Sequence, residues 1–212
     1  MKAVLAFLML LVLLAVGGAF FLVSREKAPD SVVQAELAGV KFRFARAYAR
    51  DEATGAGGLA DRLSFVAAFP AFTPLSGKNV STKEKVTLAV TPKEDPLDPA
   101  ERPAKLYARF LTPETKEGPG GLVLREFEQG SPYDFERLYI APPDGRTFFA
   151  RCAKPDSSGP GEGCLSIFRV GAMDVEVRFP PSLLEQWDTL IDGARGLLLR
   201  MTSPPVRKKK KG

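Results

Sequence analysis

The side chains that most often carry enzyme chemistry are scarce in this sequence. Its 212 residues include no histidine. This removes Ser-His and Cys-His nucleophile pairs and every metal site that needs a histidine ligand. The chemistry that remains open is a Ser-Lys pair, a pair of carboxylates or a metal site built from carboxylates.

Two pairs of carboxylates are close enough in sequence to be considered. Asp95 and Asp98 lie in a Pro-rich connection, and Glu126 and Glu128 lie on one face of an amphipathic strand. Solvated charge explains both pairs better than acid-base chemistry does. We therefore expect no catalytic residue, no cofactor and no metal site, although active sites can assemble from residues distant in sequence.

The two cysteines, Cys152 and Cys164, are separated by a stretch rich in Pro, Gly and Ser. Such a stretch between two strand-like runs is a loop whose ends can meet. In an oxidising compartment the expected product is a disulfide, which stabilises a loop of this size by about 3 kcal/mol. Two reduced thiols in a cytoplasmic domain are the alternative. The spacing does not fit the C-x-x-C pattern of redox or zinc sites.

Positive charge is concentrated at the carboxyl end of the chain. Of 30 Lys and Arg residues, five form a run that consists of Arg207, Lys208, Lys209, Lys210 and Lys211; the other 25 balance the 25 Asp and Glu residues. A neutral body makes nucleic acid an unlikely partner. The run could contact anionic lipid, at about 1 kcal/mol for each charge near the surface, or remain a solvated tail.

The segment that would position everything else is an apolar run over residues 3–23. It contains no charge and no proline, and at about 1.5 Å per residue a helix of this length spans about 31 Å, close to the thickness of a bilayer core. We interpret it as an uncleaved anchor. The alternative is a cleaved signal peptide with Gly17 and Ala19 before the cut. The organisation that follows is a transmembrane signal-anchor over residues 1–24, a linker over 25–31, a domain over 32–202 and a disordered basic tail over 203–212.

The domain is predicted to be α+β, with one antiparallel sheet of about six to nine strands, because short turns join successive strand-like runs. Gly39 marks a turn between the first two strands. Further strands are expected at residues 86–90, 106–111, 122–128, 135–140, 148–152, 165–170 and 173–179.

Two helices are expected to pack on one face of this sheet. The shorter covers residues 59–69, where Leu59, Leu63 and Val66 have helical spacing before Pro70. The longer covers residues 182–201, with an apolar stripe at i, i+3, i+4 and i+7 and a capping box of Ser182 and Glu185. Glycines at 193 and 196 suggest close approach of another part of the chain.

These features predict a bacterial inner-membrane protein with a single span and a non-catalytic domain facing the periplasm or exterior. The domain would bind an unknown protein partner or support the assembly of an envelope complex. One alternative is a tethered enzyme that acts on envelope polymers through carboxylates or a Ser-Lys pair. Another is a cytoplasm-facing domain whose basic tail binds lipid or nucleic acid. A short N-terminal flank before a long C-terminal domain is the layout of an exported, signal-anchored protein. The charges that flank residues 3–23 are nearly balanced and do not themselves set an orientation.

Overall fold

The computed structural model describes residues 30–75, 81, 84–155 and 163–202. The predicted signal-anchor, most of the linker and the basic tail therefore lie outside the described residues. Within the described ranges, no helix is both long and apolar enough to span a membrane.

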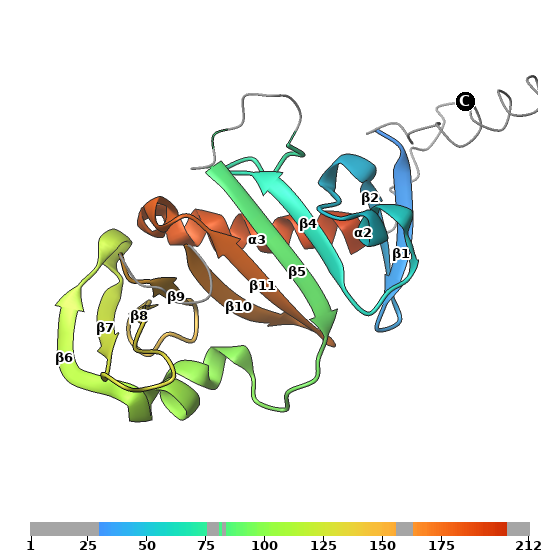
Figure 1. Ribbon diagram of the computed structural model, residues 1–212. Coiled ribbons are helices and arrows are strands. Elements are labelled where there is room, and N and C mark those ends of the chain that lie inside the picture. Colours follow the sequence, from blue (N-terminus) through green and yellow to red (C-terminus); the bar gives the residue numbers. More distant parts are fainter. Residues whose placement is uncertain (1–29, 76–80, 82–83, 156–162, 203–212) are drawn as a thin grey trace, which may run out of the picture.

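The chain forms two β-sheets and a long C-terminal helix, which confirms the α+β class (Figure 1). The strands of the large antiparallel sheet are, in spatial order, β4 (Leu63–Ala68), β5 (Lys85–Pro92), β11 (Met173–Phe179), β10 (Cys164–Val170), β9 (Phe149–Ala153), β8 (Glu136–Ile140), β7 (Val123–Phe127) and β6 (Leu111–Glu117). The strands of the small sheet are, in spatial order, β2 (Val40–Ala45), β1 (Val32–Leu37) and β3 (Gly58–Leu59).

The hairpin of β1 and β2 follows directly from its sequence. Ala38 and Gly39 join the strands with φ angles of 50° and 77°, the left-handed backbone that two-residue hairpin turns require. The turn fixes the pairing of Leu37 with Val40. Alternate residues of each strand then point inward, so Phe42 and Phe44 are buried.

The predicted helix over residues 59–69 is wrong. Leu59 belongs to β3, and residues 63–68 form strand β4, which pairs with β5. The spacing of apolar residues here fits both the helical period and the strand period of two residues. Leu63, Phe65 and Ala67 alternate along the chain, and all three are buried. Pairing with the strongly alternating β5 decides between them. The short helix is instead α2 (Glu52–Ala56), which precedes β3.

The predicted strand over residues 106–111 is also wrong for most of its length. The chain forms short helical segments here, η3 (Pro99–Glu101), η4 (Pro103–Tyr107) and η5 (Ala108–Phe110), and β6 begins only at Leu111. Pro103 fits the start of a helical turn, where a missing N–H costs nothing. Tyr107 fills the core from this segment.

The C-terminal helix is confirmed, with a different start. A 3₁₀ segment, η7 (Pro181–Gln186), leads into α3 (Trp187–Thr202). The predicted capping box does not form, since the Glu185 side chain accepts a hydrogen bond from the Gly120 N–H at 3.1 Å instead. The apolar stripe of α3 is buried against one face of the large sheet. Gly193 lies directly against the ring of Phe72, so the expected close approach is present there.

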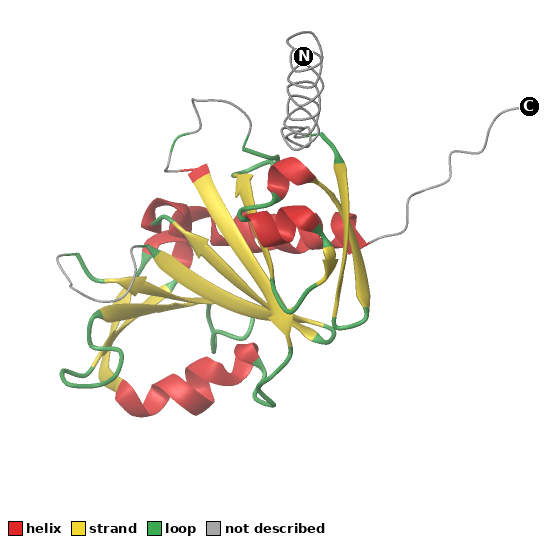
Figure 2. Ribbon diagram, turned by 45° about the vertical axis from the view of Figure 1, so that its right-hand side comes forward, coloured by secondary structure: helices red, strands yellow, loops and turns green. Residues whose placement is uncertain are grey.

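The large sheet separates two apolar cores. Alternate residues of β10 point to opposite sides, with Phe168 in the core under α3 and Ile167 in the core under η4. Figure 2 shows α3 and the helical segment of residues 99–110 on opposite sides of this sheet. The small sheet lies at one end of the molecule and β6–β9 at the other (Figure 1).

Candidate functional site

The two cysteines form the predicted disulfide. Cys152 and Cys164 are direct cross-strand partners on β9 and β10, with their Cα atoms 4.0 Å apart. The bond joins the half of the large sheet that lies over α3 to the half that extends away from it. No cysteine is left free in the protein.

A row of charged side chains continues from this disulfide across the sheet. Arg137 is the cross-strand neighbour of Cys152 on one side and of Glu126 on the other. Lys154 follows Cys152 by two residues, and Lys116 pairs with the residue two before Glu126. Because directly paired residues share a face and side chains alternate along a strand, these four charged residues project from the same face of the sheet.

Three basic side chains share the single carboxylate of Glu126. Its oxygens lie 3.1 Å from Nε of Arg137, 3.6 Å from Nζ of Lys154 and 3.9 Å from Nζ of Lys116. Lys154 also donates a hydrogen bond of 2.7 Å to the backbone oxygen of Asp134. We call the face formed by Lys116, Glu126, Arg137 and Lys154 the basic face, since positive charge exceeds negative charge among them by two.

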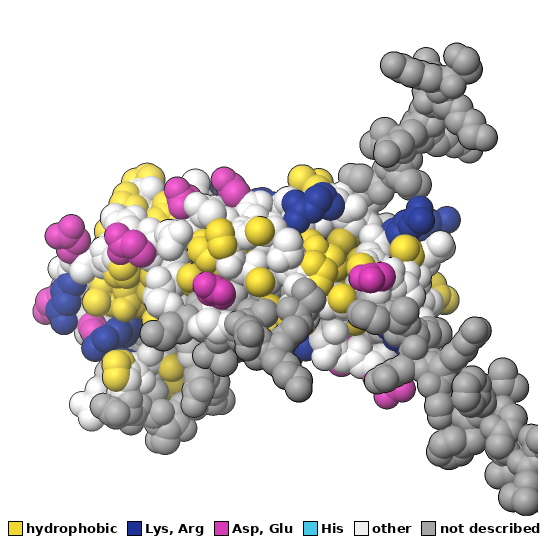
Figure 3. All heavy atoms as spheres, turned by 90° about the horizontal axis from the view of Figure 1, so that it is seen from above, with side chains coloured by type: hydrophobic (Ala, Val, Ile, Leu, Met, Phe, Trp, Pro, Cys, Tyr) yellow, Lys and Arg dark blue, Asp and Glu magenta, His cyan; other side chains and the backbone are white. Residues whose placement is uncertain are grey.

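The basic face is accessible to a partner. The Lys116 side chain is 62% exposed and that of Arg137 is half-buried. Figure 3 shows basic side chains at the end of the molecule formed by β6–β9 and again at the opposite end. Glu128 is exposed beyond the end of β7 and takes no part in the row.

The opposite side of the same strands carries an aromatic cluster. Arg151 lies over the rings of Tyr107 and Tyr133, at 5.5 and 5.0 Å from their centres, and its Nη1 lies 2.9 Å from the Glu136 carboxylate. Burial raises the pKa of Glu136, and the charge of Arg151 opposes that rise. The ion pair of Arg151 with Glu136 and its contacts with the two tyrosine rings indicate a structural role for Arg151.

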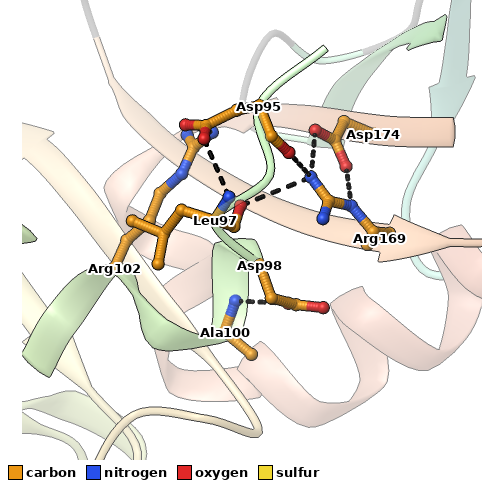
Figure 4. Close-up of polar contacts among 7 residues, drawn as sticks. All are labelled: Asp95, Leu97, Asp98, Ala100, Arg102, Arg169 and Asp174. Atoms are coloured by element: carbon orange, nitrogen blue, oxygen red, sulfur yellow. Dashed lines mark hydrogen bonds and ion pairs between the residues drawn. The ribbon is translucent and has the colours of Figure 1, made fainter. Parts of the chain in front are cut away.

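Asp95 and Asp98 hold the connection between β5 and β6 in place (Figure 4). The Asp95 carboxylate accepts a hydrogen bond of 2.8 Å from the Leu97 N–H, and the Asp98 carboxylate accepts one of 2.9 Å from the Ala100 N–H. Both residues cap local turns, as short acidic side chains often do.

Arg169 and Asp174 clamp this connection to the hairpin of β10 and β11. The Arg169 guanidinium binds both carboxylate oxygens of Asp174, at 2.6 and 2.9 Å, and donates to the backbone oxygen of Asp95 at 2.9 Å (Figure 4). The hydrogen bond that Arg169 donates to Asp174 is the main reason that the pKa of Arg169 is raised. This pair stabilises the crossing of the connection over the sheet.

The candidate residues from the sequence therefore have unequal outcomes. The disulfide is confirmed, Asp95 and Asp98 cap turns, Glu126 is in ion pairs, Glu128 is exposed, and the run from Arg207 to Lys211 lies outside the described residues. In the part of the chain that is described, no group of three or more Asp, Glu or Cys side chains could hold a metal ion. The basic face was not predicted, because its members come from separate strands whose order in the sheet is not local information.

No protein-family model matches the sequence, and no curated protein sequence matches it significantly. Similar solved structures include Smlt3025, described as an immunity protein of the Stenotrophomonas maltophilia type IV secretion system. It has a TM-score of 0.59 and 16% identity over 82% of this chain and 94% of that chain. Another is the Neisseria meningitidis iron-regulated outer membrane lipoprotein FrpD, with a TM-score of 0.46 and 8% identity over 82% of this chain and 93% of that chain. The likeness to Smlt3025 establishes a shared fold.

Proposed function

We propose that this chain is a single-pass membrane protein of the bacterial envelope, whose exported, non-catalytic domain binds an acidic protein partner. Residues 3–23 are the anchor in this proposal. The disulfide of Cys152 and Cys164 supports export, since disulfides persist in oxidising compartments and are rare in the cytosol.

The observation that carries the proposal is the basic face. Three cations surround one carboxylate at Glu126 on an accessible sheet face. Ion pairs that remain in contact with solvent contribute little to stability, about 0–1 kcal/mol each. Their stronger effect is on recognition, since complementary charge steers association and selects partners. A partner that presents a patch of Asp and Glu side chains fits this surface.

The likeness to Smlt3025 suggests a class of partner. That protein is described as an immunity protein of a type IV secretion system. By fold-level analogy, we propose that the partner of the present chain is also a protein connected with a secretion system.

The alternatives are supported by fewer observations. A tethered enzyme that uses carboxylates would need them to face one another in a cleft, whereas Asp95 and Asp98 accept backbone hydrogen bonds and Glu126 is shared by three cations. A cytoplasm-facing domain predicts reduced cysteines, which the paired geometry of Cys152 and Cys164 does not favour.

Export is tested by alkylating thiols in intact cells with and without reductant, followed by mass measurement. We expect Cys152 and Cys164 to resist alkylation in the denatured protein until they are reduced. Free reaction of both thiols without reductant would remove the main support for export and favour the cytoplasm-facing alternative.

Partner binding is tested by cross-linking the full-length protein in its native membrane with a carbodiimide, which couples amines to carboxylates in direct contact. We expect an intermolecular product joined through Lys116 or Lys154 that diminishes at high salt, where screening weakens exposed charge interactions. Lys116→Glu leaves the Lys154 amine available and should abolish the product.

Two control variants separate the effect of losing the positive charge at position 116 from the effect of losing a reactive amine. Lys116→Arg keeps the positive charge while removing one amine, and Lys85→Glu makes the same charge change at an exposed position on β5. Lys116→Arg should retain the product through Lys154, and Lys85→Glu should retain it through Lys116 or Lys154. A product that survives Lys116→Glu, or that is lost equally in Lys85→Glu, would refute binding at the basic face.

A further inference from the structure

One face of the small sheet points away from the core. The pairing of Gln34 with Arg43 and of Glu36 with both Lys41 and Leu59 places their side chains on a common face. Val32, two residues before Gln34, shares it. We call this the outer face of the small sheet; its members are Val32, Gln34, Glu36, Lys41, Arg43 and Leu59.

Exposed apolar side chains gather at this end of the molecule. In the described residues, the large hydrophobic side chains that stand exposed are Leu59 at 87%, Leu199 at 61% and Val32 at 54%. Two of them belong to the outer face. Leu199 lies in the last turn of α3, which contacts β2. Val32 and Leu59 thus add exposed apolar surface to the outer face, and such surface can contact a protein or a membrane.

A groove of about 600 Å³ runs between the small sheet and the end of α3. The buried Ala35, Phe42 and Met201 border it, and Leu59 provides its exposed apolar side chain. Lys41 and Arg43 provide two positive charges and Glu36 one negative charge. The combination of apolar surface and net positive charge matches the interface of a bilayer that contains anionic lipid.

The connectivity of the chain places this end closest to the predicted anchor. Residues 24–31 join the apolar run to β1, and at about 3.5 Å per residue they span at most about 28 Å when fully extended. The five-charge run begins a few residues after Thr202, which lines the groove. Both ends of the described domain therefore lie near the small sheet, at the end opposite to β6–β9 (Figure 1).

We propose that the outer face of the small sheet lies on the bilayer surface and that its groove binds the headgroup of an anionic phospholipid. Lys41 and Arg43 contact the phosphate, and Val32 and Leu59 enter the interfacial region. This inference rests on the proposed anchoring. It directs the basic face away from the membrane, where a partner can reach it.

The test uses the full-length protein in vesicles of phosphatidylcholine, with or without phosphatidylglycerol. In Leu59→Cys the new thiol is the single free one, because Cys152 and Cys164 are paired. An environment-sensitive fluorophore at position 59 should shift to shorter wavelengths and be quenched by a lipid-borne quencher when phosphatidylglycerol is present. The same label at Lys116→Cys, on the far end, should not respond.

Charge reversal at Lys41 and Arg43 should remove the response to phosphatidylglycerol. Each cation near an anionic surface favours the docked state roughly fivefold, so loss of the two positive charges alone should weaken docking roughly 30-fold, and their reversal should weaken it further. Reversal at Lys85 serves as the control and should have no effect. A label at position 59 that ignores phosphatidylglycerol while the protein still floats with the vesicles would overturn the docking inference and leave the anchoring intact.

Two other outcomes also decide the matter. If the protein does not float with vesicles, the proposed anchoring fails and the docking inference fails with it. If the label at position 59 is shielded only after envelope proteins are added, the outer face binds a protein and the lipid assignment is wrong.

Discussion

At the scale of single residues, Glu136 shows how burial and a charged partner compete. Its carboxylate accepts a hydrogen bond of 2.9 Å from Arg151, whose guanidinium lies over Tyr107 and Tyr133. Burial raises the pKa of Glu136 despite the neighbouring positive charge. The native state therefore holds this proton to a higher pH than the unfolded chain does.

This difference predicts a pH dependence of stability. Between the unfolded pKa, about 4.3, and the higher native pKa, the native state binds more protons, so the free energy of unfolding falls as pH rises. Glu136→Gln removes the titrating group and should flatten this fall. Urea denaturation at a series of pH values measures it, with Glu128→Gln as a control for removing an exposed carboxylate. An unchanged slope in Glu136→Gln would contradict the assignment.

Asp51 shifts in the opposite direction. Burial alone would raise its pKa, but hydrogen bonds outweigh burial, chiefly the one of 2.8 Å from the Thr54 N–H, so the pKa is lowered. The stability that this carboxylate contributes is therefore present above the ordinary Asp pKa and is lost as pH falls toward the native value.

Asp51→Ala should lower the free energy of unfolding by about 1 kcal/mol at neutral pH, the usual cost of losing a helix cap. The difference from the wild type should shrink in acid, where the wild-type carboxylate is protonated as well. Asp61→Ala, an exposed position just before β4, is the control. If Asp51→Ala lowers the free energy of unfolding by the same amount in acid as at neutral pH, the cap acts through packing alone.

At the scale of elements, the sequence was informative where only one period was present. The alternation of β1, β2, β5 and β11 predicted those strands, and the apolar stripe of α3 predicted the helix. It was misleading at residues 59–69, where helical and strand spacing coincide and only the pairing with β5 resolves them. Tertiary context decides such segments.

The candidate site likewise contains one feature that local sequence predicted and one that it did not. Cys152 and Cys164 flank one loop, so their pairing was predictable from local sequence. Lys116 and Arg137 lie on β6 and β8, and Lys154 directly follows β9; these strands become neighbours only when β6–β9 assemble. No local pattern marks these three side chains as partners of one carboxylate.

The two glycines of α3 make a matched pair for testing packing at this scale. A Cβ at Gly193 would overlap the ring of Phe72, whereas a Cβ at Gly196 would meet only the end of the Arg200 side chain at 3.4 Å. Gly193→Ala should therefore destabilise by about 1–3 kcal/mol through overpacking. Gly196→Ala should stabilise by up to about 1 kcal/mol through helix propensity.

Thermal and urea unfolding of the two variants measure these opposite signs. Because both replacements are the same, any general effect of alanine on the unfolded chain is shared. Equal shifts in the two variants would contradict the role of Phe72 in setting the residue at position 193.

At the scale of the whole molecule, the disulfide is the covalent link between the two halves of the large sheet. It closes a loop with a sequence separation of 12 residues. Replacing both cysteines with serine should lower the free energy of unfolding by about 3 kcal/mol. Reductant should produce a similar loss in the wild type and none in the double variant, which chemical denaturation with and without reductant can measure.

The molecule has two candidate binding surfaces at opposite ends. The basic face lies on β6–β9, and the outer face of the small sheet lies at the end from which the chain leads toward residues 3–23 (Figures 1 and 3). Sites that are well separated and share no partner contribute independently. Binding to lipid and to an acidic partner should therefore be additive.

If the two surfaces bind independently, a substitution in one surface should not affect binding at the other. Lys116→Glu should abolish the carbodiimide product with the partner while leaving the response of a label at position 59 to phosphatidylglycerol unchanged. Reversal of Lys41 and Arg43 should remove the lipid response and leave the partner product. A double-mutant cycle with both readouts measures any coupling between the ends. Coupling above about 0.5 kcal/mol would mean that the large sheet transmits a change from one end to the other, because in the described residues the two surfaces lie at opposite ends of the molecule.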